Sequence, residues 1–290
     1  MFAAVQSGEA SYGVVPFENS SNGSVVFTLD LLADLQGRHQ DLLVCGEAYV
    51  QVRHCLLGHV QTKSVNGAAA SDQSTEDEPP TSKKAPAKPL HDISHVKKIY
   101  SHPQAWGQCK VFLSDHLRGI ERQDVSSTSK AAELVAEDAS GTSAAISSRM
   151  AADLNKLDVL AQGIEDNEGN STRFFILQRR ERDQQTSDDD SATTDDELDY
   201  KTLVSFTVEH GEPGALADCL AVLKKHGLNL SSINSRPSGE TPWHYIFLVE
   251  ILGRKRCHDG GGKVNAALLE LDQVAKSSRW LGSWANRLVR

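Results

Sequence analysis

The sequence lacks long hydrophobic runs, an N-terminal leader pattern and closely spaced cysteines. No apolar stretch approaches the roughly 18 residues of a membrane-spanning helix, and the N-terminal MFAAVQSGEASYG has neither a basic region nor a hydrophobic one. The five cysteines are odd in number, far apart and never at CxxC spacing, which argues against a disulfide framework and against a zinc site. We therefore expect a cytoplasmic protein with no metal and no membrane partner.

A basic surface stripe is also missing. The net charge is −9, but the stretch 181–200 carries nine acidic residues and one arginine, a net of −8, so the rest of the chain is close to neutral. Nucleic-acid binding requires clustered Lys and Arg, so the sequence predicts no nucleic-acid partner.

The length and composition indicate two domains. A chain of 290 residues with 39% hydrophobic content can form more than one core. The stretch 181–200 has no hydrophobic period, so we expect an acidic linker between a domain at 1–180 and a domain at 201–290. Residues 62–92, rich in Ser, Ala, Lys and Pro, are expected to be a disordered insertion.

The first domain alternates short apolar runs with helical patterns. Pro16 is expected to end a strand, and Pro103 to lie in the first turn of a helix. Alternating strands and helices indicate an α/β fold with a largely parallel sheet, whose ligands lie beyond the carboxyl ends of the strands. The expected strands are 12–15, 97–101, 144–146 and 173–177, and the expected helices are 28–36, one from 103, 129–138 and 148–154.

The second domain has a different order of elements: strand, helix, strand, strand, helix, strand. This βαββαβ order is typical of a ferredoxin-like module. The expected strands are 202–208, 228–235, 244–252 and 279–285, and the expected helices are 213–227 and 264–275.

Four polar clusters lie near strand ends of the first domain. Hydroxyl and amide groups at helix N termini accompany anion sites, because free backbone N–H groups and the helix dipole point there, so the recurrence predicts a site for a small carboxylate. For each cluster alone, ordinary helix capping is the alternative. The clusters are 18–21, 101–104, 126–128 and 170–173.

Two pairs of side chains refine this prediction. Gln104 and Gln108 lie one turn apart on the expected helix, so both amides share a strip beside its core face. Thr172 and Arg173 place a hydroxyl and a guanidinium at one strand end. A guanidinium can bind a carboxylate through two parallel hydrogen bonds. A solvated helix strip and an exposed arginine are the alternatives.

Seven motifs, in order, resemble the prephenate dehydratase family: YGVVPFENSSNGSV, GEAYVQVRHCLL, YSHPQAWGQC, AAISSRMAADL, NSTRFFIL, PGALADCL and NLSSINSRP. The resemblance covers nearly the whole chain outside the insertion and the linker. It implies an enzyme that converts prephenate to phenylpyruvate with release of water and carbon dioxide and without a cofactor. It further implies a two-lobed catalytic domain similar to periplasmic binding proteins, followed by an ACT domain that binds phenylalanine as effector.

The resemblance also assigns roles to residues of the catalytic domain. Thr172, in the TRF motif, matches the catalytic threonine of the family, and Asn19 and Gln108 match further active-site positions. His102 is expected to be a capping or packing residue and not a general acid. The residues expected to contact the substrate are Ser20, Ser101, Thr128, Arg173 and Phe174.

The effector motifs resemble those of the family's ACT domains, with one departure. Asn234 stands where many members have a glutamate before the SRP motif. Since ACT modules commonly pair, a homodimer or higher homo-oligomer is expected. The expected effector-binding residues are Gly214, Ala215, Leu216, Asn229, Leu230, Ser235, Arg236 and Pro237.

Family members have a longer segment ahead of the position matching Phe2, including a glycine-rich motif that lines the cleft. We therefore expect a truncated chain with an incomplete first lobe, whose own activity stays open. Three alternatives also remain: an arogenate dehydratase, a non-catalytic phenylalanine-binding regulator, and a generic carboxylate-binding protein with two lobes.

Overall fold

The computed structural model describes four stretches of the chain, residues 1–61, 86–180, 199–256 and 261–288. Nearly all of the expected linker and most of the expected insertion lie outside these stretches. Within the insertion, residues 86–92 are described, and the Leu90 N–H donates to the Leu160 carbonyl over 2.7 Å. Part of the expected insertion therefore bonds to β8 (Asp158–Gln162) of the neighbouring sheet. None of the described helices is long and apolar enough to cross a membrane.

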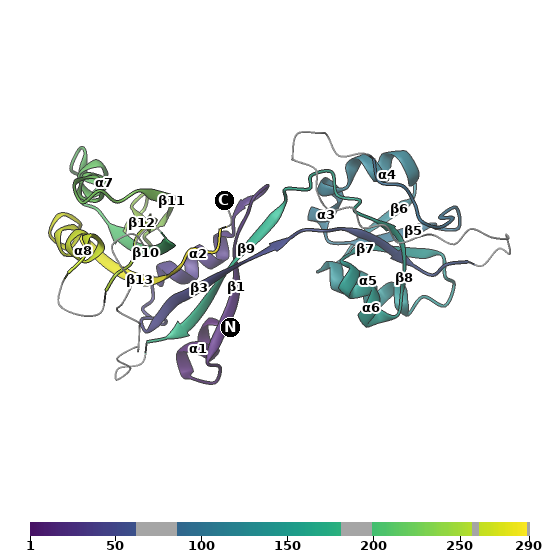
Figure 1. The fold of residues 1–290 in the computed structure, drawn as a ribbon, viewed down its shortest axis with the longest axis horizontal. Coiled ribbons are helices and arrows are strands. Elements are labelled where there is room, and N and C mark those ends of the chain that lie inside the picture. The colour runs from purple at the N-terminus through teal and green to yellow at the C-terminus, as the bar shows by residue number, and fades with distance from the viewer. Residues whose placement is uncertain (62–85, 181–198, 257–260, 289–290) are drawn as a thin grey trace. The chain divides into compact units, whose positions relative to one another are not determined.

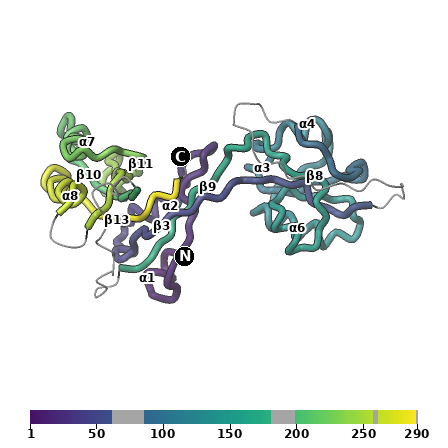
Figure 2. Tube along the Cα trace, in the orientation of Figure 1, coloured from purple at the N-terminus to yellow at the C-terminus, as the bar shows by residue number. Residues whose placement is uncertain are grey.

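These stretches form two compact units (Figure 1). The first unit combines Met1–Val50 with Ser171–Arg290, and the second unit is Gln51–Asn170. The chain passes between the units twice, after Val50 and before Ser171 (Figure 2). The second unit is therefore an insertion in the sequence of the first.

The N-terminal part of the first unit is a four-stranded sheet in the order β2-β1-β9-β3. Pro16 was expected to end its first strand, but β1 continues through it to Asn19. A register shift between Pro16 and Glu18 explains this, because a bulge tolerates a residue that has no N–H to donate. The elements here are α1 (Phe2–Ser7), β1 (Tyr12–Asn19), β2 (Gly23–Ser24), α2 (Val26–Ala33), β3 (Leu42–Gln51) and β9 (Ser171–Arg179).

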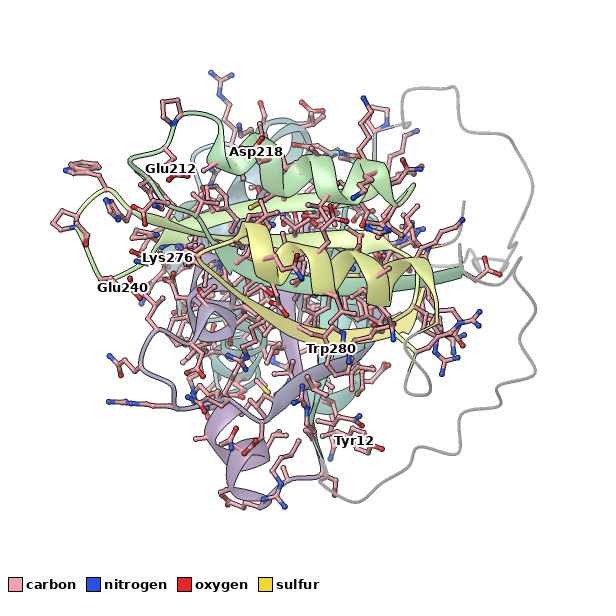
Figure 3. The ribbon with its side chains drawn as sticks, turned by 90° about the vertical axis from the view of Figure 1, so that its left-hand side faces the viewer. Tyr12, Glu212, Asp218, Glu240, Lys276 and Trp280 are labelled. Carbon is pink, nitrogen blue, oxygen red and sulfur yellow. The ribbon has the colours of Figure 1, made fainter. Side chains whose placement is uncertain are left out.

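The C-terminal part of the first unit is a second sheet, in the order β11-β12-β10-β13, with every pair antiparallel. Helices α7 and α8 cover one face, where Val222 and Leu271 pack against Val204 and Val249. Figure 3 shows both helices, with Asp218 on α7 and Trp280 on β13. The expected order of elements in this part is confirmed. They are β10 (Tyr200–Thr207), α7 (Ala215–Lys225), β11 (Leu230–Pro237), β12 (Tyr245–Leu252), α8 (Lys263–Val274) and β13 (Ser277–Ala285).

The two sheets of the first unit share one hydrophobic core. Phe17 and Phe175 of the first sheet stack with ring centroids 3.9 Å apart, and Trp284 of the second sheet meets Phe175 edge-on at 5.2 Å. Leu203 and Leu248 of the second sheet are buried in the same cluster. Stacked and edge-on aromatic pairs add to the free energy gained from burial, so this cluster joins the sheets firmly.

The second unit has a five-stranded sheet in the order β6-β5-β7-β4-β8, with helices on both faces (Figure 1). Phe112 and Leu113 of α4 pack on one face against Ile99 and Ile146, and α5 and α6 form a separate core on the other face. The elements are β4 (Cys55–Gly58), β5 (Lys98–Ser101), α3 (Pro103–Gln108), α4 (Lys110–His116), β6 (Glu121–Asp124), α5 (Thr128–Ala136), β7 (Ser143–Ser147), α6 (Arg149–Asn155) and β8 (Asp158–Gln162).

The expectation of a largely parallel sheet is wrong. β5 pairs in parallel with β6 and β7, but β4 pairs antiparallel with β7 and β8, and β1 pairs antiparallel with β2 and β9. Helical crossovers explain the parallel pairs. Helices α3 and α4 connect β5 to β6, and α5 connects β6 to β7. β1 instead pairs with β9, which belongs to the same unit but follows the whole second unit in the sequence, and a local alternation of strands and helices cannot reveal such a pairing.

The backbone of Gly282 on β13 lies very close to that of Val44 on β3, and this close approach leads to a testable prediction. An added Cβ at Gly282 would lie 2.0 Å from the Val44 carbonyl oxygen, and the φ of 132° is itself unfavourable for a side chain. Gly282→Ala is therefore expected to destabilise the protein by at least about 1–3 kcal/mol, because backbone has to move. Urea unfolding measures the change. Gly211→Ala is the control, since no atom lies within 4 Å of the added Cβ. Equal stability of the two variants would contradict the close approach.

Candidate active site

The best-defined polar pair in the first unit is Asn19 with Thr172, the last residue of β1 and the second residue of β9. The antiparallel register places them directly opposite each other. The Asn19 side-chain amide donates to the Thr172 hydroxyl oxygen over 3.1 Å and to the Ser171 carbonyl over 3.2 Å. The structure thus brings together two of the three residues predicted to be catalytic.

The turn that follows β1 holds the Asn19 side chain in place. The Asn19 side-chain oxygen accepts from the N–H groups of Ser21 and Asn22, each over 3.0 Å, which is the pattern of an Asx turn. Ser20 bonds to Ser171 twice, through its N–H and through its hydroxyl oxygen, each over 2.9 Å. The carboxamide orientation is therefore fixed by several backbone groups and does not depend on a ligand.

This arrangement determines what the Thr172 hydroxyl can do. Its oxygen accepts the Asn19 amide proton, so its own proton can be donated to another group. Thr172 is half-buried, and Phe174, on the same face of the strand, is half-buried as well. The pair can therefore offer a hydrogen-bond donor beside an aromatic ring.

Arg173 differs from its neighbours, because successive strand residues point to opposite faces of a sheet. Its guanidinium donates to Glu47 through Nε over 2.9 Å and through Nη2 over 2.6 Å, and also pairs with Glu250. Its side chain is only 8% exposed. The expectation that Arg173 grips a substrate carboxylate has no support in this geometry, since carboxylates of the protein itself occupy the guanidinium.

Glu47, Arg173, Lys201 and Glu250 together form a buried, charge-balanced ion network. Lys201 Nζ lies 3.2 Å from Glu47 Oε1 and 3.7 Å from Glu250 Oε1. Burial alone would raise the pKa of Glu47, but Arg173, the Arg287 N–H and Lys201 hold that pKa below its ordinary value. Burial acts to lower the pKa of Arg173, but its partners Glu250 and Glu47 raise it by more, so the net shift is upward. Both shifts favour the charged form, so Glu47 and Arg173 are charged in the folded protein at neutral pH.

Sequence reasoning missed Glu47, Lys201 and Glu250, although a signal was present. Glu47 and Glu250 each interrupt an apolar strand, in LLVCGEAYV and YIFLVEIL, and buried acids are rare unless they are paired. The identity of the cation could not be read from the sequence, because Arg173 lies 126 positions from Glu47 and 77 from Glu250.

The other predicted site residues of the catalytic part lie in the second unit. The Gln108 side-chain oxygen contacts His54 Nε2 over 2.7 Å. The Ser101 hydroxyl is fully buried and donates to the Ile146 carbonyl over 2.9 Å, which is a structural use of this group. Thr128 is the first residue of α5 and half-buried. His102 caps α3 by accepting from the Gln104 N–H, so its expected capping role is confirmed.

The expected effector residues lie at two places in the second sheet of the first unit and its helix α7. Gly214, at a φ of 93°, is the N-cap of α7 and is followed by Ala215 and Leu216, while the remaining residues lie on or just before β11. Asn229 accepts from the Leu252 N–H through its carbonyl over 2.8 Å, and Leu230 is 39% exposed.

Strand β11 also contacts α2 and β2 of the same unit. Arg236 donates to both oxygens of Asp30, over 2.5 and 3.3 Å. Asn234, the residue that departs from the family pattern, accepts from the Ser24 hydroxyl over 2.7 Å. Ser24 lies on β2, which pairs with β1 close to Asn19. A direct chain of contacts therefore connects the effector motif to the end of β1.

No cluster of His, Cys, Asp or Glu suited to hold a metal ion occurs among the residues that the structure describes. Four of the cysteines, Cys45, Cys55, Cys109 and Cys219, are free thiols, and Cys257 lies outside the described stretches. Burial raises the pKa of the Cys45 thiol to about 11, so it is not a reactive thiolate at neutral pH.

Comparison with protein families gives two matches. The description "Prephenate dehydratase" applies to residues 1–182, and "ACT domain" applies to residues 202–256. The chain is 32% identical over 290 residues to a bifunctional chorismate mutase/prephenate dehydratase of Aquifex aeolicus. The match includes all of this chain and 65% of that relative, so the chain spans just under two thirds of the length of this relative.

Two solved structures are similar over nearly the whole chain. A prephenate dehydratase of Arthrobacter aurescens in complex with L-Phe has a TM-score of 0.72 and 30% identity, covering 98% of this chain and 78% of that one. A protein described as a novel type of quorum quenching acylase, GqqA, has a TM-score of 0.71 and 27% identity, covering 98% of this chain and 85% of that one. Since two proteins with different descriptions share this fold, function has to be inferred from the site residues and not from the fold.

The ion network leads to a prediction about stability. Glu47→Gln leaves Arg173 and Lys201 with one buried carboxylate between them, so we expect a loss of about 3–5 kcal/mol in the free energy of unfolding at neutral pH. The folded-state pKa of Glu47 is depressed, so its stabilisation is present above the pKa of an unfolded glutamate and is lost as pH falls through the folded-state value. The difference between wild type and variant, measured by urea unfolding at several pH values, should shrink on acidification.

The matched control is Glu133→Gln, which removes one partner of the exposed Lys130–Glu133 pair on α5. We expect its unfolding midpoint to stay close to that of the wild type. A Glu47→Gln protein as stable as the Glu133→Gln protein would show that the buried network is not stabilising.

Proposed function

The chain belongs to the prephenate dehydratase family, and on that premise we propose that it converts prephenate to phenylpyruvate in phenylalanine biosynthesis. The observation that supports this most directly is the Asn19–Thr172 hydrogen bond. It fixes a hydroxyl donor at the position where the family resemblance expects the catalytic threonine. The proposal concerns the dehydratase activity alone and requires no cofactor.

The proposed reaction removes the ring carboxylate and the ring hydroxyl of prephenate together. The C–C bond to the carboxylate breaks to release carbon dioxide, and its electron pair enters the ring. The C–O bond breaks at the opposite ring carbon, and the departing hydroxide takes a proton from solvent to become water. Because aromatisation drives the step, a strong general acid is unnecessary, and a well-placed hydrogen-bond donor is enough.

We assign the Thr172 hydroxyl to the departing oxygen, since accepting from Asn19 leaves its proton available. The amide of Gln108 is assigned to a substrate carboxylate. Ser20, Phe174 and Thr128 remain proposed substrate contacts. Arg173 and Ser101 are left out, because their polar groups are engaged inside the protein.

We further propose that the finer architecture follows the family. The catalytic domain, residues 1–180, has two lobes, the second of which is the unit Gln51–Asn170. Residues 201–290 form a ferredoxin-like ACT domain, in agreement with the matched stretch 202–256 and the order of its elements. The stretch 181–200 is the proposed linker, the protein is proposed to be cytoplasmic, and pairing of ACT domains gives a homodimer or higher homo-oligomer.

Phenylalanine is the proposed effector of the ACT domain. Support comes from the L-Phe complex of the Arthrobacter aurescens relative and from the contacts of β11 with Asp30 and Ser24. An effector changes activity only if it binds two states of the protein differently. We propose that these contacts transmit the difference from β11 to β1.

Two alternatives are separated by simple measurements. An arogenate dehydratase performs the same elimination on a substrate with an amino group in place of the keto group, so turnover of purified prephenate and arogenate distinguishes the two. A non-catalytic regulator binds phenylalanine in calorimetry and turns over neither substrate.

Thr172→Val tests the catalytic assignment, because it keeps the shape of the side chain and removes the donor. We expect kcat for phenylpyruvate formation to fall by about 10²–10³, the usual effect of losing one donor that stabilises the transition state. Thr172→Ser keeps the hydroxyl and should retain most of the activity. If Thr172→Val turned over prephenate at the wild-type rate with an unchanged melting temperature, Thr172 would have no part in the chemistry.

Asp30→Asn tests the regulatory assignment by removing the charge that pairs with Arg236. Binding of phenylalanine, measured by calorimetry, should persist, whereas the change in kcat/KM on adding phenylalanine should become smaller. Lys276→Gln is the control, since it removes an ion pair with Glu240 elsewhere in the same domain, over 3.2 Å (Figure 3). A full response in Asp30→Asn would exclude this contact as the link.

A further inference from the structure

His54 and Gln108 form a side-chain contact in the second unit that the proposed function does not yet explain. His54 Nε2 lies 2.7 Å from Gln108 Oε1. His54 is only 6% exposed, directly before β4, while Gln108 is half-buried at the end of α3. A buried histidine is most often satisfied by backbone groups, but here the ring bonds to a side chain that matches an active-site position of the family.

The segment after β8 holds the backbone of His54 on both sides. The His54 N–H donates to the Glu165 carboxylate over 2.8 Å, and the His54 carbonyl accepts from the Ile164 N–H over 3.0 Å. Glu165 is itself only 2% exposed. A buried carboxylate that accepts a backbone N–H fixes that backbone firmly, because leaving either group unsatisfied would cost free energy.

The same segment also holds Gln108. The Asp166 N–H donates to the Gln108 carbonyl over 2.7 Å. The Asp166 carboxylate accepts from the N–H groups of Lys110 and Val111, over 2.9 and 3.1 Å, at the start of α4. Cys109, with φ −129° and ψ 30°, breaks the helix between α3 and α4. Gln108 thus lies at a break between two helices, and Asp166 stabilises this break. Asp166 directly follows Glu165, which bonds to the backbone of His54.

The tautomer of His54 determines whether Gln108 presents a hydrogen-bond donor or an acceptor to a ligand. If Nε2 carries a proton, it donates to the Gln108 carbonyl oxygen and turns the amide NH2 outward as a donor. If Nε2 is bare, the amide NH2 turns inward and the carbonyl oxygen faces outward as an acceptor. Only the first arrangement suits a carboxylate or a departing hydroxyl, because both accept hydrogen bonds.

We propose that His54 is a positioning residue, which donates from Nε2 to Gln108 and thereby presents the Gln108 amide NH2 to the substrate. Ile164, Glu165 and Asp166 set the distance between the two side chains by holding both backbones. The use of the amide in catalysis rests on the proposed function, whereas the orientation of the amide does not.

The first experiment is a double-mutant cycle on prephenate turnover, with His54→Phe and Gln108→Met. His54→Phe keeps an aromatic ring and removes the donor, and we expect kcat/KM to fall by up to about 100-fold, as for a misplaced catalytic group. Because His54 acts through Gln108, adding His54→Phe to Gln108→Met should cause little further loss. His54→Gln, which can still donate from its own amide, should recover part of the activity.

Additive losses in the cycle, with melting temperatures equal across the variants, would contradict the proposal. A merely structural histidine predicts that outcome, since its effect would not depend on the residue at position 108. Variants that fail to fold do not decide the matter, so the second experiment uses the wild-type chain alone.

The second experiment measures the tautomer of His54 by ¹⁵N–¹H NMR of the full wild-type chain with labelled histidine, the signal being assigned through NOEs between the His54 ring and Gln108. A proton on Nε2 supports the proposal, and a bare Nε2 at neutral pH overturns it. If Nε2 is protonated but the wild-type chain forms no phenylpyruvate from prephenate, the orienting contact stands and the proposed function fails. The two hypotheses are therefore tested separately.

Discussion

The buried network of Glu47, Arg173, Lys201 and Glu250 is the constraint on which the first unit depends. Its charges balance, and Arg173 reaches carboxylates from both sheets of the unit. Side chains alternate along a strand, so fixing Arg173 on one face of β9 places Thr172 on the other. The network that holds the two sheets together thereby determines which face of β9 the candidate catalytic hydroxyl occupies.

The sequence alone was sufficient to place most helices and strands, because apolar periodicity and the Pro and Gly signals are local. The helix after His102 and the element order from Tyr200 to Ala285 are examples. It was insufficient for sheet direction and for strand ends such as Pro16, which depend on partners far along the chain. For the candidate site, the Asn19–Thr172 pair agrees with the expectation that strand ends gather polar groups, while the role expected of Arg173 could not anticipate its carboxylate partners.

The two polar pairs, one in each unit, follow the same physical principle. Asn19, whose side-chain oxygen accepts two backbone N–H groups, directs the donor of Thr172. In our proposal His54, whose backbone is held by Ile164 and Glu165, directs the amide of Gln108. Neither pair uses a strong acid, in keeping with an elimination that aromatisation drives. Because the similar solved structures include one described as an acylase, such details of orientation are more informative about function than the fold.

The insertion of Gln51–Asn170 within the first unit has a consequence for biosynthesis on the ribosome. β1 is translated before the inserted unit, but its partner β9 is translated only after the whole of that unit. The inserted unit can complete its own sheet during translation, whereas the nascent N-terminal strands stay unpaired until much later. Such late, non-local pairing is slow, so the edge of β1 that β9 will cover is open to aggregation until β9 has been translated.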